Sequence, residues 1–161
     1  MDVTLVYSGD ETTIPQSSIL LGILESDPDS LQERVLLNLA RCMLQLSDLD
    51  AANRPKYLKS AVLATTLAIT LSLFRTEDEE SLPNNVQTAL MLRCKAYSNL
   101  SKWSKATADA KKLIKSGGSA SEQGQKLLAG IERKRTIQFK KDKKLAKDIC
   151  RLVQSARIVQ C

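Results

Sequence analysis

The sequence contains no histidine, and this absence narrows the chemistry that the protein can perform. Histidine is the commonest general base near neutral pH and a frequent zinc ligand. The four cysteines are far apart and form no Cys-x-x-Cys pair: Cys42, Cys94, Cys150 and Cys161. The nucleophile motif of hydrolases, the phosphate-binding glycine loop and the dinucleotide-binding fingerprint are missing as well. The sequence therefore predicts no enzyme, no cofactor and no metal site.

Long apolar runs and targeting signals are also missing. The longest apolar run, residues 61–74, is interrupted by threonine and serine and falls short of the roughly 20 residues that span a bilayer. No basic residues precede an apolar segment at the N-terminus, where a signal peptide would carry them. Widely spaced cysteines do not indicate a secreted disulfide framework. We therefore expect a protein of the cytoplasm or the nucleus that does not associate with membranes.

Aromatic residues, glycine and proline are scarce too. Aromatic residues make up 4% of the 161 residues, and there are only 6 glycines and 4 prolines. An all-β protein with many turns needs more of each. Hydrophobic residues reach 43%, with leucine and alanine prominent, which suits one domain of packed helices. The predicted fold class is all-α.

Apolar spacing divides the chain into three parts. Residues 1–14 are predicted to form an extended or disordered arm, because Val3, Leu5 and Tyr7 alternate as one short strand that lacks a partner. Residues 15–118 are predicted to form pairs of helices. Residues 119–161 are predicted to form a long basic helix that packs on the last pair or extends from it. The predicted helices cover residues 15–26, 30–48, 55–75, 84–99, 101–116 and 119–156.

Helix ends carry several local signals. Ser30 and Glu33 fit a capping box, and Ser101 is a candidate N-cap for the helix that follows it. The serine- and glycine-rich segment 116–121 predicts a flexible joint before the last helix. Its composition is also typical of engineered linkers.

One helix–turn–helix segment resembles a tetratricopeptide repeat. Its first helix offers the large Leu90, the small Cys94 and the aromatic Tyr97. Its turn offers the aromatic Trp103, followed three residues later by the small Ala106. Repeats of this family are about 34 residues long and pair two helices, so the match covers residues 84–116. The resemblance implies a stack of antiparallel helix pairs with a peptide-binding groove along the first helix of each pair.

A second and more distorted unit, residues 31–74, resembles the same family. The run Leu37-Asn38-Leu39-Ala40-Arg41-Cys42 is similar to the middle repeat of immunophilin-type co-chaperones. Those proteins grip the acidic tail of a chaperone with a clamp of lysine, arginine and asparagine. Asn38 matches the middle clamp asparagine, whereas Thr88 and Leu92 stand where the lysine and arginine of the third repeat belong. This departure removes much of the positive charge that such a tail requires.

The resemblance implies an adaptor that binds a peptide or a helix of a partner protein, and an acidic partner is one option. The polar residues predicted to contact that peptide are Asn38, Arg41, Arg93 and Lys95. Binding of a chaperone tail is one alternative. A purely structural role for Asn38 in its helix is another.

Positive charge is concentrated at the C-terminal end. Residues 126–161 carry 11 Lys or Arg against 3 Asp or Glu, whereas residues 1–125 carry 13 against 15. The basic patch consists of Arg133, Lys134, Arg135, Lys140, Lys141, Lys143 and Lys144. It fits a solvated helix, an acidic protein partner, a nuclear import signal or nucleic-acid phosphates. Nucleic acid is the least favoured, because only Phe139 could stack on a base.

An apolar stripe follows the basic patch. Leu145, Ile149, Leu152 and Ala156 recur at spacings of four and three residues. Two such turns are too few to predict a coiled coil. The stripe would instead dock on the preceding helices or pair with another helix, so self-association through the C-terminal helix is open.

Overall fold

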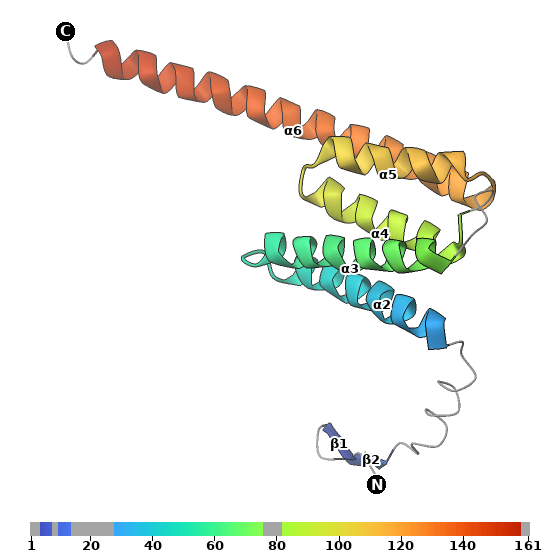
Figure 1. Ribbon diagram of the computed structural model, residues 1–161. Coiled ribbons are helices and arrows are strands. Elements are labelled where there is room, and N and C mark those ends of the chain that lie inside the picture. Colours follow the sequence, from blue (N-terminus) through green and yellow to red (C-terminus); the bar gives the residue numbers. More distant parts are fainter. Residues whose placement is uncertain (1–3, 8–9, 14–27, 76–81, 159–161) are drawn as a thin grey trace.

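The computed structural model describes residues 4–7, 10–13, 28–75 and 82–158. Five helices make up nearly all of these residues and pack into an all-helical body, as the sequence predicts (Figure 1). The helix predicted over residues 15–26 lies outside the described residues. The helices are α2 (Pro28–Leu49), α3 (Arg54–Arg75), α4 (Asn84–Asn99), α5 (Trp103–Lys115) and α6 (Gly118–Ile158).

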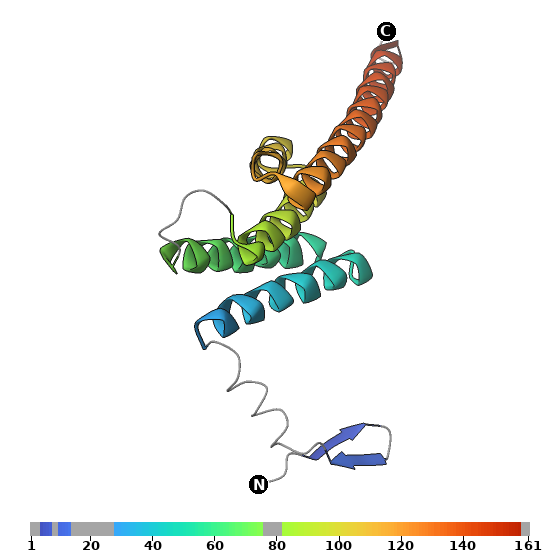
Figure 2. The same ribbon diagram turned by 90° about the vertical axis from the view of Figure 1, so that its right-hand side faces the viewer.

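The N-terminal arm contains a two-stranded antiparallel ribbon. Strand β1 (Thr4–Tyr7) pairs with β2 (Asp10–Thr13), so that Thr4 lies opposite Thr13 and Tyr7 opposite Asp10. The expectation that this strand lacks a partner is therefore wrong, because the polar residues that follow it supply one. The ribbon contacts none of the described helices and lies at the opposite end of the molecule from the C-terminus (Figure 2).

Helices α2, α3 and α4 pack through small side chains. Ala40 of α2, Ala64 and Ala68 of α3 and Ala89 of α4 are all buried in one cluster with Leu37. Alanine at these contacts lets the helix backbones approach closely, which explains why α3 is so rich in it. By length and composition α3 could cross a membrane; 39% of its apolar span is buried here, and the helix packs against α2 and α4.

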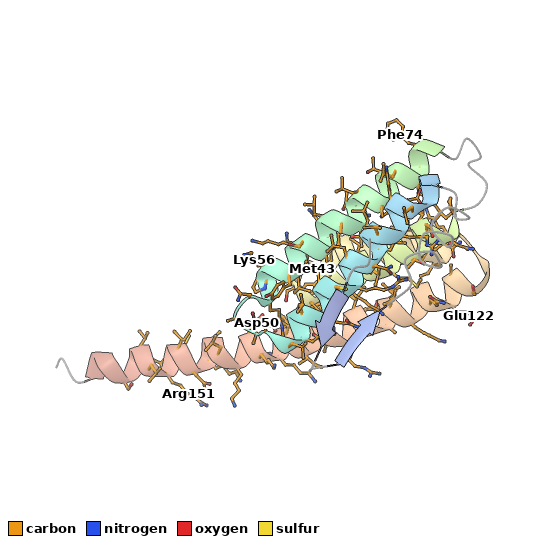
Figure 3. The ribbon with its side chains drawn as sticks, turned by 90° about the horizontal axis from the view of Figure 1, so that it is seen from below. Met43, Asp50, Lys56, Phe74, Glu122 and Arg151 are labelled. Atoms are coloured by element: carbon orange, nitrogen blue, oxygen red, sulfur yellow. The ribbon has the colours of Figure 1, made fainter. Side chains whose placement is uncertain are left out.

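The turn between α2 and α3 is held by one carboxylate. Asp50 accepts hydrogen bonds from the backbone amides of Ala52 and Asn53 and from the Asn53 side chain, at 2.8–3.2 Å. The bonds from Asn53 hold the pKa of Asp50 below its ordinary value. Figure 3 shows Asp50 and Lys56 together at this end of the two helices. The connector is thus an ordered turn that sets how α2 and α3 face each other.

Helices α4, α5 and the start of α6 form the second half of the core. Leu90 of α4 and Leu113 of α5 are fully buried with Ala120 of α6. At Gly124 of α6 an added Cβ would lie 2.9 Å from the Ile114 side chain and 3.0 Å from the carbonyl oxygen of Ala110. The two helices therefore touch where glycine leaves room.

The flexible joint predicted over residues 116–121 is a tight turn instead. Gly117 and Gly118 have φ angles of 77° and 54°, which glycine adopts without strain, and α6 begins at Gly118. Ala120 is already buried in the core at the first turn of α6. The prediction of a flexible joint is wrong because burial of Ala120 fixes the turn against the core.

Some other helix boundaries also differ from the prediction, by one or two residues. Helix α3 begins one residue before the predicted start and α4 matches its predicted bounds. Helix α2 begins at Pro28, two residues before the predicted start. Ser101 does not cap α5, because it has a φ of 57° and the N-cap position is Lys102. The left-handed Ser101 ends α4 rather than starting α5.

Helix α6 consists of a packed half and a free half. The packed half, residues 118–131, places Ala120, Leu127 and Ile131 against α4 and α5. The free half, residues 132–155, has no buried side chain, and every residue except the partly exposed Asp148 is exposed. Figures 1 and 2 show this half extending past the end of the body. Thus α6 both closes the core and projects from it.

Candidate functional site

A groove runs across α2, α4 and α6. Helix α2 touches α4, and α4 touches α6, so that one face of each helix lies on the same side of the body. The groove encloses about 470 Å³. Its lining residues are Arg41, Leu44, Gln45 and Asp48 from α2, Leu92, Lys95 and Asn99 from α4, and Lys134 from α6.

Positive charge dominates the rim of this groove. Each of the three helices supplies one cation, and these are Arg41, Lys95 and Lys134. The single acidic residue among the lining side chains is Asp48. All three cations are exposed, so they are solvated and available to a ligand. The groove therefore favours an anionic ligand.

Two hydrogen bonds hold the rim cations in place. The Arg41 guanidinium donates to Asn38 Oδ1 at 2.6 Å, and Lys134 Nζ donates to Asn99 Oδ1 at 2.8 Å. Both acceptors are neutral amide oxygens, so neither bond pairs the cation with a negative charge. Both cations can therefore attract an anionic ligand. The bond from Lys134 to Asn99 also links α6 to α4 across the groove.

The floor of the groove is apolar. Leu92 is buried in the core cluster that joins α2, α3 and α4, and Leu44 packs against the same cluster. A ligand that enters the groove meets aliphatic surface below and cations at the edge. This combination suits a peptide with both apolar and acidic side chains, because each kind finds its own contact.

The residues predicted to bind a peptide are only partly brought together. Arg41 and Lys95 line the groove, as predicted, and Asn38 lies beside it as the hydrogen-bond partner of Arg41. Arg93 does not line the groove. It faces α5 and α3, where its guanidinium donates to both carboxylate oxygens of Asp109 at 2.8 and 2.9 Å and to Thr66 Oγ1 at 3.3 Å.

The Arg93–Asp109 pair is structural. The two side chains are 14% and 5% exposed, and the bidentate geometry is the strong form of this interaction. Burial alone lowers the pKa of the Arg93 guanidinium, but hydrogen bonding and attraction to Asp109 outweigh it, so the net shift is upward. Removing one partner of such a pair costs about 3–5 kcal/mol, because it leaves an uncompensated buried charge. The assignment of Arg93 to the peptide site is corrected accordingly.

The basic patch does not form one surface. Successive residues of a helix are turned by about 100°, so a run of basic residues surrounds the helix axis. Lys134 joins the groove, and Arg135 lies on another side beside Trp103. The remaining members are exposed along the free half of α6: Arg133, Lys140, Lys141, Lys143 and Lys144.

Three groove residues escaped the sequence analysis. Gln45 and Asn99 are polar residues on exposed helix faces and carry no signal of their own. Lys134 was grouped with its charged neighbours rather than with Arg41 and Lys95. Lys134 belongs to the groove because α6 packs on α4. That contact joins segments about 35 residues apart, so a local sequence pattern does not predict it.

No described side chain offers catalytic chemistry at the groove. Cys94 lies behind it, fully buried, with its sulfur 3.4 Å from the carbonyl oxygen of Ala106. Burial raises the pKa of this thiol to about 11, so it is protonated and unreactive at neutral pH. Within residues 28–75 and 82–158 there is also no cluster of three potential metal ligands. The groove can hold a ligand by charge and apolar contact.

Comparison with known proteins gives no relative for this arrangement. No protein-family model matches the chain, no curated protein matches it, and no solved structure matches it.

Proposed function

We propose that the protein is an adaptor that holds an acidic peptide of a partner protein in the groove between α2, α4 and α6. The observation that carries the proposal is the convergence of Arg41, Lys95 and Lys134 from three helices over an apolar floor. Carboxylates bind such cations through charge-assisted hydrogen bonds, each worth roughly 1.5–3 kcal/mol. Cytoplasm or nucleus is the compartment we propose, in line with the reduced cysteines.

A tetratricopeptide-like architecture is part of the same proposal. In that architecture α2 with α3 and α4 with α5 are antiparallel pairs, and the first helices of successive pairs line one face. The contacts support it, because α2 touches α4 and α4 touches α6, whereas α3 and α5 do not touch each other. In this scheme α6 takes the place of a third first helix.

The peptide expected in the groove is short and its affinity modest. A volume of about 470 Å³ holds only a few residues, and ordering a flexible peptide costs entropy that these contacts must offset. The chaperone tail predicted as an alternative is one acidic peptide among many that fit. Asn38 supports the site indirectly in this proposal, because its amide oxygen orients Arg41.

The test is binding of a defined acidic peptide to the full chain. The probe is a fluorescein-labelled peptide with alternating Glu and Leu and a free C-terminal carboxylate, and its control replaces Glu by Gln and the carboxylate by an amide. The triple variant Arg41→Ala/Lys95→Ala/Lys134→Ala should weaken binding of the acidic peptide at least about tenfold. Fluorescence polarisation at about 0.15 M salt measures the effect.

A matched variant separates the groove from overall charge. Lys59→Ala/Lys111→Ala/Lys112→Ala removes the same charge from exposed positions of α3 and α5 outside the groove. This variant should bind the acidic peptide within about twofold of the wild type, since screened surface charges contribute little. Equal losses in the two variants would show general attraction between opposite charges, and the proposed groove would be wrong.

A further inference from the structure

The apolar face of α6 does not end where the body ends. In the packed half this face carries Leu127 and Ile131, which α4 and α5 bury. With about 100° between successive residues, Leu145, Ile149 and Leu152 fall within roughly 60° of the direction of Ile131. The free half of α6 therefore continues the face that the packed half buries.

No described residue covers this continuation. Leu145, Ile149 and Leu152 are 60%, 51% and 68% exposed, and the neighbouring Phe139 and Val153 are 68% and 50% exposed. We call these five residues the α6 stripe. Leaving such a stripe in water costs free energy, and contiguous exposed apolar surface marks interaction sites.

Charge lies on both flanks of the stripe. At about 100° per residue, Lys141 follows one edge and Lys143 follows the other. Asp148 lies on the Lys141 edge, and its carboxylate is 3.8 Å from the guanidinium of Arg151, which lies on the side away from the stripe. Figure 3 shows Arg151 on the projecting part of α6, well away from the body. A complementary partner needs acidic residues along both edges of its apolar side.

We propose that the free half of α6 binds an amphipathic helix of a partner protein, whose apolar side covers the α6 stripe and whose acidic flanks face Lys141 and Lys143. This site is separate from the groove and does not depend on the proposed peptide binding there. Helix-on-helix packing fits because the stripe has the four- and three-residue spacing of helix–helix seams. The basic flanks set which partner is accepted.

A hollow at the base of the free half marks where the partner helix ends. Trp103 of α5 and Phe139 of α6 line this hollow of about 590 Å³, together with Arg135. It lies where α6 leaves the body, beside the turn between α4 and α5. A large apolar side chain at one end of the partner helix fits here, since aromatic pockets anchor such residues.

A membrane surface is a poorer occupant of the stripe. Asp142 lies between Phe139 and Leu145 on the apolar face, and Gln138 Nε2 donates to its carboxylate at 2.8 Å. Burying this carboxylate among acyl chains is costly, whereas a protein partner can supply a donor for it.

A second copy of this chain is also a poorer occupant. Both flanks of the stripe are basic, so a parallel pair and an antiparallel pair of these helices each set lysines against lysines.

The test measures binding of a designed helix to the full chain. The probe is a synthetic peptide of about three heptads with two Leu per heptad and Glu along both edges of its apolar side, and the comparison peptide has Lys in place of Glu. Isothermal titration calorimetry should detect the Glu peptide and give at least about tenfold weaker binding for the Lys peptide. The variant Leu145→Gln/Ile149→Gln/Leu152→Gln should lose the Glu peptide, with unchanged circular dichroism and unchanged binding of the groove peptide.

Two charge variants with equal net charge sharpen the result. Lys141→Gln/Lys143→Gln removes charge from the two edges of the stripe, whereas Lys140→Gln/Lys147→Gln removes the same charge from the opposite side of α6. The first should weaken the Glu peptide several-fold more than the second, because opposite charges attract strongly only at short range. Equal effects of the two variants, or retained binding by the triple Gln variant, would overturn the proposal.

Two further outcomes would assign the stripe to another occupant. Light scattering that gives twice the monomer mass, lost in the triple Gln variant, would identify a second copy of this chain. Binding to phosphatidylserine vesicles, lost in the same variant and without binding of the Glu peptide, would identify a membrane surface. Either result would overturn the helix-binding proposal, and neither would affect the groove.

Discussion

The two halves of α6 differ in what covers them. In the packed half, Ala120 and Ile131 are 4% and 3% exposed because α4 and α5 lie against them. In the free half, Leu145 and Leu152 continue the same face at 60% and 68% exposure. Apolar periodicity alone therefore does not distinguish a core face from an interface. A core face is one that another helix of the same chain covers, whereas an interface face is left for a partner.

The two halves also differ in what keeps them helical. The packed half is held by tertiary contacts, which supply most helix stability in proteins. Beyond the hydrogen bond from Lys134 to Asn99 at its base, the free half is held by local contacts such as the hydrogen bond from Gln138 to Asp142 and the pair Asp148–Arg151. Exposed contacts of this kind each contribute at most about 1 kcal/mol. We therefore expect the free half to lose helical structure before the body unfolds.

The largest expected effect compares one isoleucine from each half. Ile131→Ala should lower the free energy of unfolding by about 2–5 kcal/mol, because it leaves a cavity between α4, α5 and α6. Ile149→Ala should change it by less than about 0.5 kcal/mol, because Ile149 is exposed. Urea denaturation followed by circular dichroism measures both. Similar losses would mean that the chain itself covers the free half in solution.

The next effect compares two glycines within the packed half. Gly124→Ala should destabilise the protein by about 1–3 kcal/mol, because the new methyl group meets Ile114 and the backbone of α5. Gly130→Ala should stabilise it by about 0.5–1 kcal/mol, since an added Cβ there has no neighbour within 4 Å and alanine favours helix. Melting temperatures that shift in opposite directions are the expected result. A stabilised Gly124→Ala variant would contradict the close contact between α5 and α6.

The smallest effect concerns pH and compares a buried cysteine with an exposed one. The pKa of Cys94 is raised to about 11, so the unfolded chain loses this proton at lower pH than the folded protein. The contribution of Cys94 to the free energy of unfolding is therefore fully present below about pH 9. It falls by up to about 1.4 kcal/mol per pH unit between about pH 9 and 11. Urea titrations of the wild type and of Cys94→Ala across this range should differ in slope.

The control is Cys150, which is exposed in the free half. Cys150→Ala should leave the free energy of unfolding at neutral pH nearly unchanged, because folding does not bury this side chain. In the folded protein at neutral pH, iodoacetamide should modify Cys150 and spare Cys94. Rapid modification of Cys94 would show that the contact between α4 and α5 opens readily.

The sequence is a good guide to the helices and a weaker guide to their ends. Pro83 and the apolar spacing after it predict α4 to the residue. Ser101 misled the prediction because a serine before a helix has the side chain of a cap, whereas its backbone φ of 57° serves the end of α4. Backbone angles of this kind depend on how two helices are joined, and no local pattern records them.

The groove shows why a site is harder to predict than a helix. Arg41 and Lys95 were predicted as polar residues on the first helices of the expected repeats, and both line the groove. Arg93 was misassigned because its partner Asp109 lies 16 residues away, on the next helix. Lys134 was not assigned to the groove, because its neighbours there lie on α2 and α4, far from it in the sequence. The peptide site, the adaptor role and the resemblance to tetratricopeptide repeats stay predictions that the binding experiments test.

The continuity of α6 has a mechanical consequence. Residues 132–158 form an arm of about 40 Å at 1.5 Å per residue, continuous with the packed half. A tilt of about 5° at the packed end moves the tip by roughly 3–4 Å, so the helix acts as a lever. Lys134 lies near its pivot, where its bond to Asn99 bridges the groove. A load on the tip would therefore be felt as strain at that bond, and a peptide pushing Lys134 aside would swing the tip.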